Sequence, residues 1–170
     1  MADDNPVNVR ILAASLQKAG YDVLTVDNGD AAVQVATAQH PDVILLDMQM
    51  PGRDGLGVCV ALKAQDKTAS IPIIFVTAVS EAETMLKGFD AGGVDYVTKP
   101  FRTAEVLARV SVHARLHRAE TALREKKAET ETRARELSEV NKQLASLTRL
   151  DPLTGLVNRR AWEESLEQEH

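Results

Sequence analysis

The chain has 170 residues, of which 44% are hydrophobic and 26% charged, and its formal net charge is −5 at pH 7. This length suits one domain with an extension, and the acidic balance argues against nucleic acid as a partner. The single cysteine, Cys59, excludes an intramolecular disulfide. Because no apolar run is long enough to cross a bilayer, no membrane partner is expected and a cytoplasmic location is the simplest.

Helical and strand patterns alternate along the first two thirds of the chain. Taken in order, they predict a helix at 6–19, a strand at 21–26, a helix at 29–39, a strand ending at Asp47, a helix at 55–67, a strand at 71–77, a helix at 80–91, a strand at 95–98 and a helix from Thr103. Strands that alternate with helices indicate an α/β fold with a doubly wound parallel sheet.

The strand before Asp47 is wholly apolar and stops at this lone carboxylate, ahead of the turn residues Pro51 and Gly52. So hydrophobic a strand is typically covered by helices on both faces, as central parallel strands are. Open α/β sheets bind their ligands at the carboxyl ends of such strands. Asp47 is therefore a candidate functional residue, and an aspartate that only caps the following turn is the alternative.

Other polar residues stand at predicted strand ends or near the N-terminus. They are the acid pair Asp3 and Asp4, then Thr77 at the end of its strand, then Lys99 followed by Pro100. Together with the lone aspartate, this ordered set resembles the receiver domain of bacterial response regulators. The resemblance covers about residues 3–118, and we assign residues 1–118 to a receiver domain.

The resemblance implies a flavodoxin-like fold and a phosphorylation site. Asp47 would accept a phosphoryl group from a sensor histidine kinase or a phosphotransfer protein. Thr77 and Lys99 would complete the catalytic site, because phosphoryl transfer depends on positioning and charge neutralisation. The compact ammonium group of Lys99 would bind the phosphoryl oxygens.

The resemblance also implies a bound Mg²⁺, which prefers oxygen ligands. Asp4 and Asp47 would bind the ion directly, together with the backbone carbonyl of Gln49. Asp3 would act mainly through water. A divalent cation would relieve the repulsion among the three carboxylates.

Two further residues would belong to a conformational switch. Tyr96 would change rotamer as Thr77 moves toward the phosphoryl group, and the Lys99–Pro100 peptide bond would be cis. Phosphorylation would thereby reshape the face formed by the last helices and the last strand, and so control a homodimer.

The last predicted helix is unusually long, because 103–148 contains neither proline nor glycine and is rich in helix formers. Apolar residues recur there on a weak heptad, with Leu116, Leu123, Leu137 and Leu144 in one column and Ala119, Val140 and Leu147 in the other. We predict a dimeric coiled-coil linker over 119–149, and a single charged helix is the alternative.

The segment 150–160, in which Pro152 and Gly155 interrupt the helix, resembles the entry motif of GGDEF-type diguanylate cyclase domains. We assign 150–170 to the N-terminal fragment of such a domain. The signature motif and the GTP pocket of that family are absent. We therefore expect no enzyme activity from this chain, and an output in the parent protein that makes cyclic di-GMP from GTP.

One departure from the receiver pattern concerns the first strand, because only Met1 and Ala2 precede the acid pair. Losing about five buried apolar side chains, at about 1.5–3 kcal/mol each, removes roughly 7–15 kcal/mol. This is comparable with the stability of a whole domain. We therefore expect a compromised sheet, or one completed by association, with Asp3 and Asp4 on a loose end.

Two other functions stay open. The missing strand favours a dimeric structural adaptor whose receiver no longer takes phosphate. A stand-alone enzyme on a flavodoxin-like sheet has no support beyond the sheet, since Gly92-Gly93 does not form a phosphate-binding loop. We expect His113 and His117 to be solvated helix residues rather than a phosphotransfer site.

Overall fold

The structure is a computed structural model that describes residues 1–78, 82–147 and 154–157. The chain divides into two compact units, Met1–Glu120 and Thr121–His170. Most of the segment that we assign to a cyclase domain lies outside the described residues, as does the predicted helix start at Ser80.

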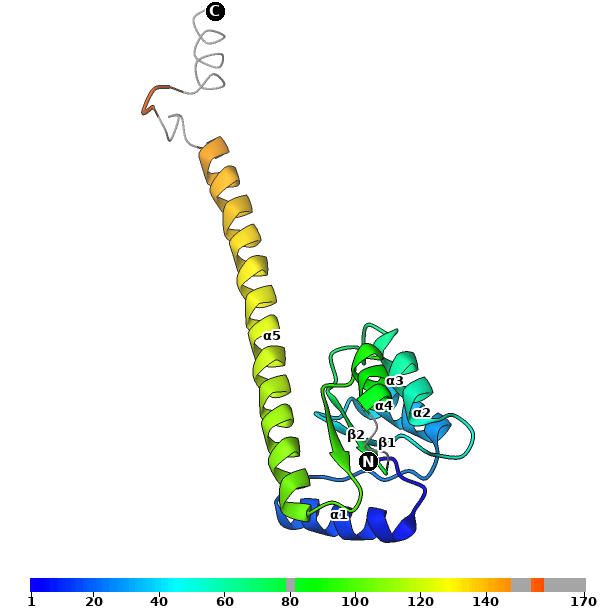
Figure 1. Cartoon of the computed structure of the whole chain (residues 1–170). Coiled ribbons are helices and arrows are strands. Elements are labelled where there is room, and N and C mark those ends of the chain that lie inside the picture. The colour runs from blue at the N-terminus through cyan, green and yellow to red at the C-terminus, as the bar shows by residue number, and fades with distance from the viewer. Residues whose placement is uncertain (79–81, 148–153, 158–170) are drawn as a thin grey trace, which may run out of the picture. The chain divides into compact units, whose positions relative to one another are not determined.

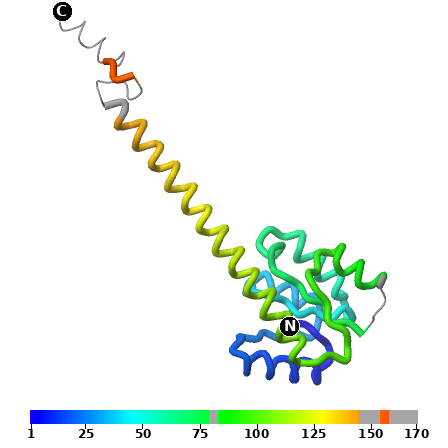
Figure 2. Tube along the Cα trace, turned by 60° about the vertical axis from the view of Figure 1, so that its left-hand side comes forward, coloured from blue at the N-terminus to red at the C-terminus, as the bar shows by residue number. Residues whose placement is uncertain are grey.

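The described elements are α1 Pro6–Lys18, α2 Gly29–Gln39, β1 Ile44–Asp47, α3 Gly55–Lys63, β2 Ile73–Thr77, α4 Ala82–Asp90, β3 Asp95–Thr98 and α5 Thr103–Leu147. The starts of α1, α2 and α3 are fixed by Asn5, Asn28 and Asp54, whose side chains accept hydrogen bonds from first-turn N–H groups. Figure 2 follows the chain from α1 into α2 and on through the sheet.

The first unit is a parallel sheet with helices on both faces, as predicted. The strand order is β1-β2-β3, and both pairs are parallel, with Ile44 opposite Ile73 and Ile74 opposite Asp95. Helix α1 and the first part of α5 cover one face, and α2 and α3 cover the other (Figure 1). Every position of β1 and β2 is buried between the helix layers. This burial explains why the sequence of these strands is apolar up to their last residues.

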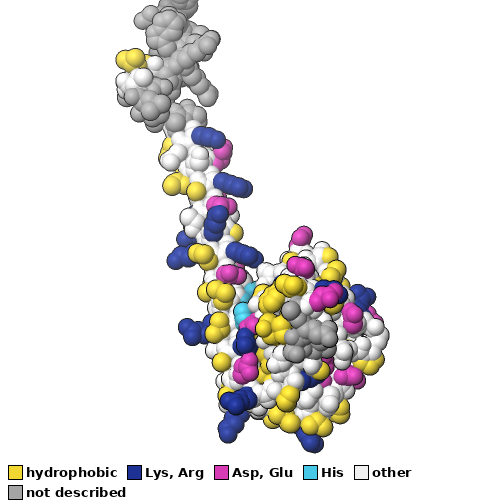
Figure 3. Space-filling model, viewed as in Figure 1, with side chains coloured by type: hydrophobic (Ala, Val, Ile, Leu, Met, Phe, Trp, Pro, Cys, Tyr) yellow, Lys and Arg dark blue, Asp and Glu magenta, His cyan; other side chains and the backbone are white. Residues whose placement is uncertain are grey.

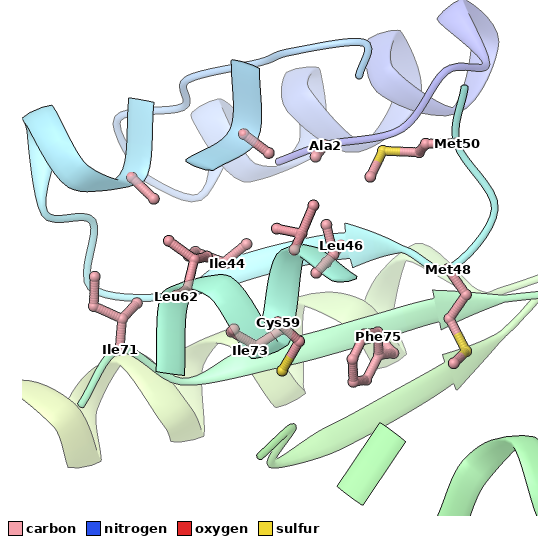
Figure 4. Packing of buried hydrophobic residues seen from close by; sticks show 13 residues of the cluster. Ala2, Ile44, Leu46, Met48, Met50, Cys59, Leu62, Ile71, Ile73 and Phe75 are labelled. Carbon is pink, nitrogen blue, oxygen red and sulfur yellow. The ribbon is translucent and has the colours of Figure 1, made fainter. Parts of the chain in front are cut away.

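Two hydrophobic clusters hold the layers together. On the α1 and α5 side, Leu12 and Leu16 pack with Val106 and Val110 against the sheet. On the other side, side chains of β1, β2 and α3 pack closely, and Ala2 and Met50 belong to the same cluster (Figure 4). Cys59 is fully buried there and burial raises its pKa, so its thiol is an unreactive core group.

The predicted strand at 21–26 is wrong as a regular element. Among the described residues, its sheet pairing is a single bridge between Val26 and Ala2, and Ala2 also bridges Leu46 of β1. The short segment Met1–Asp3 therefore lies between 21–26 and β1. Within the described part of the chain, 21–26 therefore forms an isolated bridge and not a regular ladder.

Helix α3 ends at Lys63, four residues before the predicted end. The ammonium group of Lys63 donates hydrogen bonds to the carbonyl oxygens of Ala69 and Ile71, each at 2.8 Å. These bonds stabilise the irregular chain between α3 and β2. Pro72 then delays the strand, which begins at Ile73 rather than at 71.

Helix α5 is continuous from Thr103 to Leu147, close to the predicted extent. Within the second unit, the heptad residues Leu123, Leu137, Val140 and Leu144 are all at least 50% exposed. Figure 3 shows such hydrophobic side chains along α5 among charged ones. Among the described residues, no helix is both long and apolar enough to cross a membrane.

Candidate functional site

The carboxyl ends of the three strands place the predicted residues at one edge of the sheet. Asp47 ends β1 and Thr77 ends β2, while Lys99 directly follows β3. The parallel register sets Asp47 opposite Val76 and Thr77 opposite Thr98. The backbone N–H of Lys99 also donates to the carbonyl of Thr77 at 2.7 Å, which ties the last two strand ends together.

Lys99 joins the predicted residues into one site. Its ammonium nitrogen forms an ion pair with the Oδ2 atom of Asp47 and a second with Oδ2 of Asp3 at 3.1 Å. Asp47 is 4% exposed and Asp3 is 1% exposed, so both carboxylates are shielded from water. The Lys99–Pro100 peptide bond is cis, which confirms that prediction.

The electrostatics of the site follow from this burial. Burial raises the pKa of Asp47, although the hydrogen bond from Lys99 acts against it and the charge of Asp3 adds to it. Burial also acts to lower the pKa of Lys99, but the hydrogen bonds to Asp47 and Asp3 raise it overall. The site therefore holds a protonated amine among carboxylates, and further positive charge would be stabilised there.

Asp3 is not on a loose end, so this expectation was wrong. Its N–H donates to the carbonyl of Val26 at 3.2 Å, and its Oδ1 atom accepts from the N–H of Asn5 at 2.8 Å. The side-chain amide of Asn8 donates to both Asp3 oxygens, at 3.3 and 3.2 Å. The pairing of Met1–Asp3 with neighbouring segments, together with the start of α1, fixes the position of the Asp3 carboxylate.

Sequence reasoning missed Asn8. It is the third residue of α1, five residues after Asp3, so the helix start brings its amide back to the Asp3 carboxylate. The signal was the capping residue Asn5, because a helix that begins there must place Asn8 in its first turn.

Three carboxylates lie close enough together to hold a divalent cation. Oxygen atoms of Asp3, Asp4 and Asp47 all lie within 4.8 Å of one another. Asp4 is exposed, which leaves an open side for water ligands such as Mg²⁺ keeps. The N–H of Gln49 donates to Oδ1 of Asp47 at 3.1 Å and so fixes the following turn, while the role of the Gln49 carbonyl stays a prediction.

The backbone beside Asp47 is packed too closely for side chains. A Cβ atom on Gly55 would lie 2.3 Å from the carbonyl oxygen of Asp47 and 2.8 Å from the Cα of Met48. The start of α3 therefore rests directly on the end of β1, and this contact holds the turn after Asp47 in place.

Thr77 and Tyr96, the two predicted switch partners, line one small cavity. Its volume is about 10 Å³, and Met48, Met85 and Phe89 also line it. Thr77 is buried and Tyr96 is partly buried, with the ring of Phe89 edge-on to it at 5.9 Å between centroids. Their coupled movement remains a prediction, and these contacts supply a route for it.

A second polar cluster lies where β3 meets α5. The guanidinium of Arg109 donates to both carboxylate oxygens of Asp95, at 2.6 and 2.8 Å, and His113 contacts the same carboxylate at 3.1 Å. The expectation that His113 is a solvated helix residue is therefore wrong. Burial acts to raise the pKa of Asp95, but the hydrogen bonds from Arg109, Tyr96 and His113 lower it overall.

The Asp95–Arg109 pair predicts a dependence of stability on pH. Because the folded-state pKa of Asp95 lies below its ordinary value of 3.8, the stabilisation is present above that value. It is lost as pH falls through the lower, folded-state pKa. Arg109→Leu should lower the free energy of unfolding at pH 7 by about 1 kcal/mol, since the pair is partly exposed.

Urea unfolding at pH 7 and pH 3 measures this effect. The difference between wild type and Arg109→Leu should shrink at the lower pH. Arg118→Leu is the matched control, because Arg118 pairs with an exposed carboxylate, Asp42, at 3.3 Å. A loss as large for the control as for Arg109→Leu, or a loss independent of pH, contradicts the assignment.

Fold and site together define a class of protein: a doubly wound α/β domain with a cluster of acidic residues and a lysine at the carboxyl edge of its parallel sheet. The family model of the response regulator receiver domain matches residues 1–111. The chain therefore belongs to the response regulator receiver family, and it carries the receiver domain of a two-component system.

Curated proteins and solved structures agree with this assignment. Over 108 residues the chain is 40% identical to the DNA-binding dual master transcriptional regulator RpaA of Synechocystis sp.. This match covers 64% of the chain and 45% of RpaA, so it spans less than half of that relative.

Two solved receiver domains illustrate the structural likeness. The receiver domain of sensor histidine kinase PA1611 from Pseudomonas aeruginosa PAO1, with magnesium in its active-site cleft, is 34% identical with a TM-score of 0.62. The match covers 66% of this chain and 93% of that one. The BeF3-activated receiver domain of Klebsiella pneumoniae RstA is 32% identical with a TM-score of 0.62, covering 67% and 95%.

Proposed function

We propose that Asp47 accepts a phosphoryl group from a histidine kinase or a phosphotransfer protein and that this controls association of two chains. The observation that carries the proposal is the position of Lys99, whose ammonium contacts both Asp47 and Asp3 at the carboxyl edge of the sheet. A buried carboxylate beside a fixed cation and two further acids suits phosphoryl transfer better than a structural cap does.

The chemistry requires one bond to form and one to break. A carboxylate oxygen of Asp47 attacks phosphorus, and the bond from phosphorus to the donor's nitrogen or oxygen breaks, with its electron pair leaving on the donor. Lys99 is placed to turn from Asp47 to the new phosphoryl oxygens, because its nitrogen already lies against the attacking group. Thr77, at the next strand end, would donate its hydroxyl to the same group.

The acidic cluster suits Mg²⁺, which would be held by Asp4 and Asp47, with Asp3 acting mainly through water. When bound, the ion supplies positive charge that offsets the negative charge gathered at the site. Asn8 and Lys99 hold Asp3 by side-chain contacts, so this carboxylate keeps its position without the ion. The phosphorylated donor would enter from the exposed side at Asp4.

The proposed association uses the surface of α4, β3 and α5. Large hydrophobic side chains are exposed there at Leu86, Phe89, Val94 and Val112. This surface adjoins the small cavity that Thr77 and Tyr96 line, so a rearrangement of the threonine would alter it. The exposed leucines of α5 in the second unit would form the coiled-coil linker between the same two chains.

The output of the parent protein has two candidates. The resemblance of 150–160 to a cyclase entry motif supports a diguanylate cyclase output controlled by this receiver, with no cyclase activity in the chain itself. The name of the relative RpaA favours a DNA-binding output as the second candidate. Reading the coding sequence downstream of His170 distinguishes them, because a cyclase needs its GTP-binding signature.

Measuring the association of two chains distinguishes a phosphorylation-dependent switch from a permanently dimeric adaptor. Beryllofluoride with Mg²⁺ mimics the phosphoryl group and should shift the chain from monomer to dimer in analytical ultracentrifugation, by about fivefold or more in dissociation constant. Asp47→Asn should not respond, while Asp54→Asn, which alters an exposed helix cap, should respond normally. A dimer that is the same with and without beryllofluoride would favour the adaptor.

A further inference from the structure

The carboxylate of Asp3 is surrounded by hydrogen-bond donors. Its Oδ1 atom accepts from the backbone N–H of Asn5 at 2.8 Å, and its Oδ2 atom contacts the ammonium of Lys99 at 3.1 Å. The side-chain amide of Asn8 spans both oxygens, at 3.3 and 3.2 Å. Because Asp3 is only 1% exposed, water cannot readily replace a donor that leaves.

These donors differ in how freely they can move. The ammonium of Lys99 lies at the end of a flexible four-carbon stem and is shared with Asp47. Asn8 is the third residue of α1, whose start is fixed by the Asn5 cap, and its amide has a short stem. Within the described part of the chain, the hydrogen bonds recorded for that amide go to Asp3. Asn8 is therefore the side chain that can stay on Asp3 when Lys99 moves.

The proposed function requires that movement. Lys99 would turn from the carboxylates to the phosphoryl oxygens once Asp47 is phosphorylated, and Oδ2 of Asp3 would then lose its charged partner. A buried carboxylate that loses a donor carries a free-energy penalty, which favours rotation of the side chain out of the site. The amide of Asn8 opposes this rotation because it contacts both oxygens.

The chemistry of an amide suits this role. An ionised carboxylate only accepts hydrogen bonds, so the NH₂ group of Asn8 faces Asp3. Because an amide carries no charge, it holds the carboxylate without repelling a divalent cation. A lysine at the same position would place a second ammonium beside Lys99 and would repel both it and the cation.

We propose that Asn8 is a positioning residue for phosphoryl transfer at Asp47: its amide keeps Asp3 in the site while Lys99 moves to the phosphoryl oxygens. This role rests on the proposed function and adds a residue to it. In the resting chain Lys99 still holds Asp3, so Asn8 should matter little there. It should matter most once a phosphoryl group is bound.

Beryllofluoride compares these two states without requiring turnover. Asn8→Leu removes both donors at similar volume, and Asn8→Ser leaves a side chain too short to span the carboxylate. At saturating Mg²⁺, the dissociation constant for beryllofluoride, measured by fluorine NMR, should rise by about tenfold in each variant, as for the loss of a hydrogen bond to a charged group. The dissociation constant for Mg²⁺ alone, measured by NMR titration of backbone amides, should stay close to that of wild type.

Two further variants serve as controls. Asn8→Gln keeps the amide on a stem longer by one methylene and should recover most of the beryllofluoride affinity. Gln17→Leu changes another polar residue of α1, about 13 Å along the helix, and should bind beryllofluoride like wild type.

Each outcome decides a separate point. If wild type and both Asn8 variants bind beryllofluoride equally well, the role of Asn8 is overturned while the proposed function stands. If the variants lose affinity for Mg²⁺ and for beryllofluoride in equal proportion, Asn8 only supports the start of α1 and is not a positioning residue. If wild type itself binds no beryllofluoride, the proposed function fails and the role of Asn8 fails with it.

Discussion

Incubation with acetyl phosphate and Mg²⁺ should add one phosphoryl group to the chain, and Asp47→Asn should abolish this addition. An amide cannot attack phosphorus to form an acyl phosphate, whereas the carboxylate of Asp47 is held against the cation that would stabilise the product. Lys99→Ala should slow the addition by about 10²-fold or more, since it removes the ammonium that contacts both buried carboxylates.

Intact-protein mass spectrometry measures the uptake directly. Asp54→Asn is the matched control, because Asp54 is an aspartate of the same loop that only caps α3, with Oδ1 at 2.7 Å from the N–H of Gly57. This control should take phosphate like wild type. Uptake by Asp47→Asn equal to that of wild type would remove the basis for the proposed function.

Placing four apolar residues and a leading lysine ahead of Met1 should raise the free energy of unfolding by about 3 kcal/mol, because they would fill the cavity of about 460 Å³ between 21–26 and β1. Four buried side chains contribute about 6–12 kcal/mol, and ordering their backbone costs about 4–8 kcal/mol. The new strand would also pair the N–H groups of Leu24 and Leu45. Urea unfolding of the extended and original chains, at the same concentration, gives the difference.

The same extended chain should take phosphate faster, because a complete strand would restrain Asp3 and Asp4 more firmly. An extension with aspartate at two of the four apolar positions is the control, since charged side chains cannot enter a cavity that helices cover on both faces. Equal stability of the original chain and the apolar extension would mean that no strand fills the cavity beside β1.

Much of the site could be predicted from sequence because it lies at strand ends. Parallel strands bring their carboxyl ends to one edge, so Asp47, Thr77 and Lys99 had to converge once the strands were identified. The helix and strand order followed from the same periodicity. The long helix followed from residues 103–148, which lack proline and glycine.

Other features depended on contacts between distant segments. The sequence pattern at 21–26 is that of a strand, yet strands require pairing, and this segment makes an isolated bridge with Ala2 rather than a ladder. Lys63 reaches two carbonyl groups beyond its helix, and His113 contacts Asp95 across the α5 and β3 packing. No local propensity encodes these contacts.

The sequence by itself determined the order of elements and the acidic residues with their lysine, because periodicity and residue type are local properties. Only the tertiary structure decided that Asp3 is held in place rather than loose. Its position depends on hydrogen bonds from Asn5 and Asn8, on pairing with Val26 and on the charge of Lys99, all of which arise when separate segments pack together.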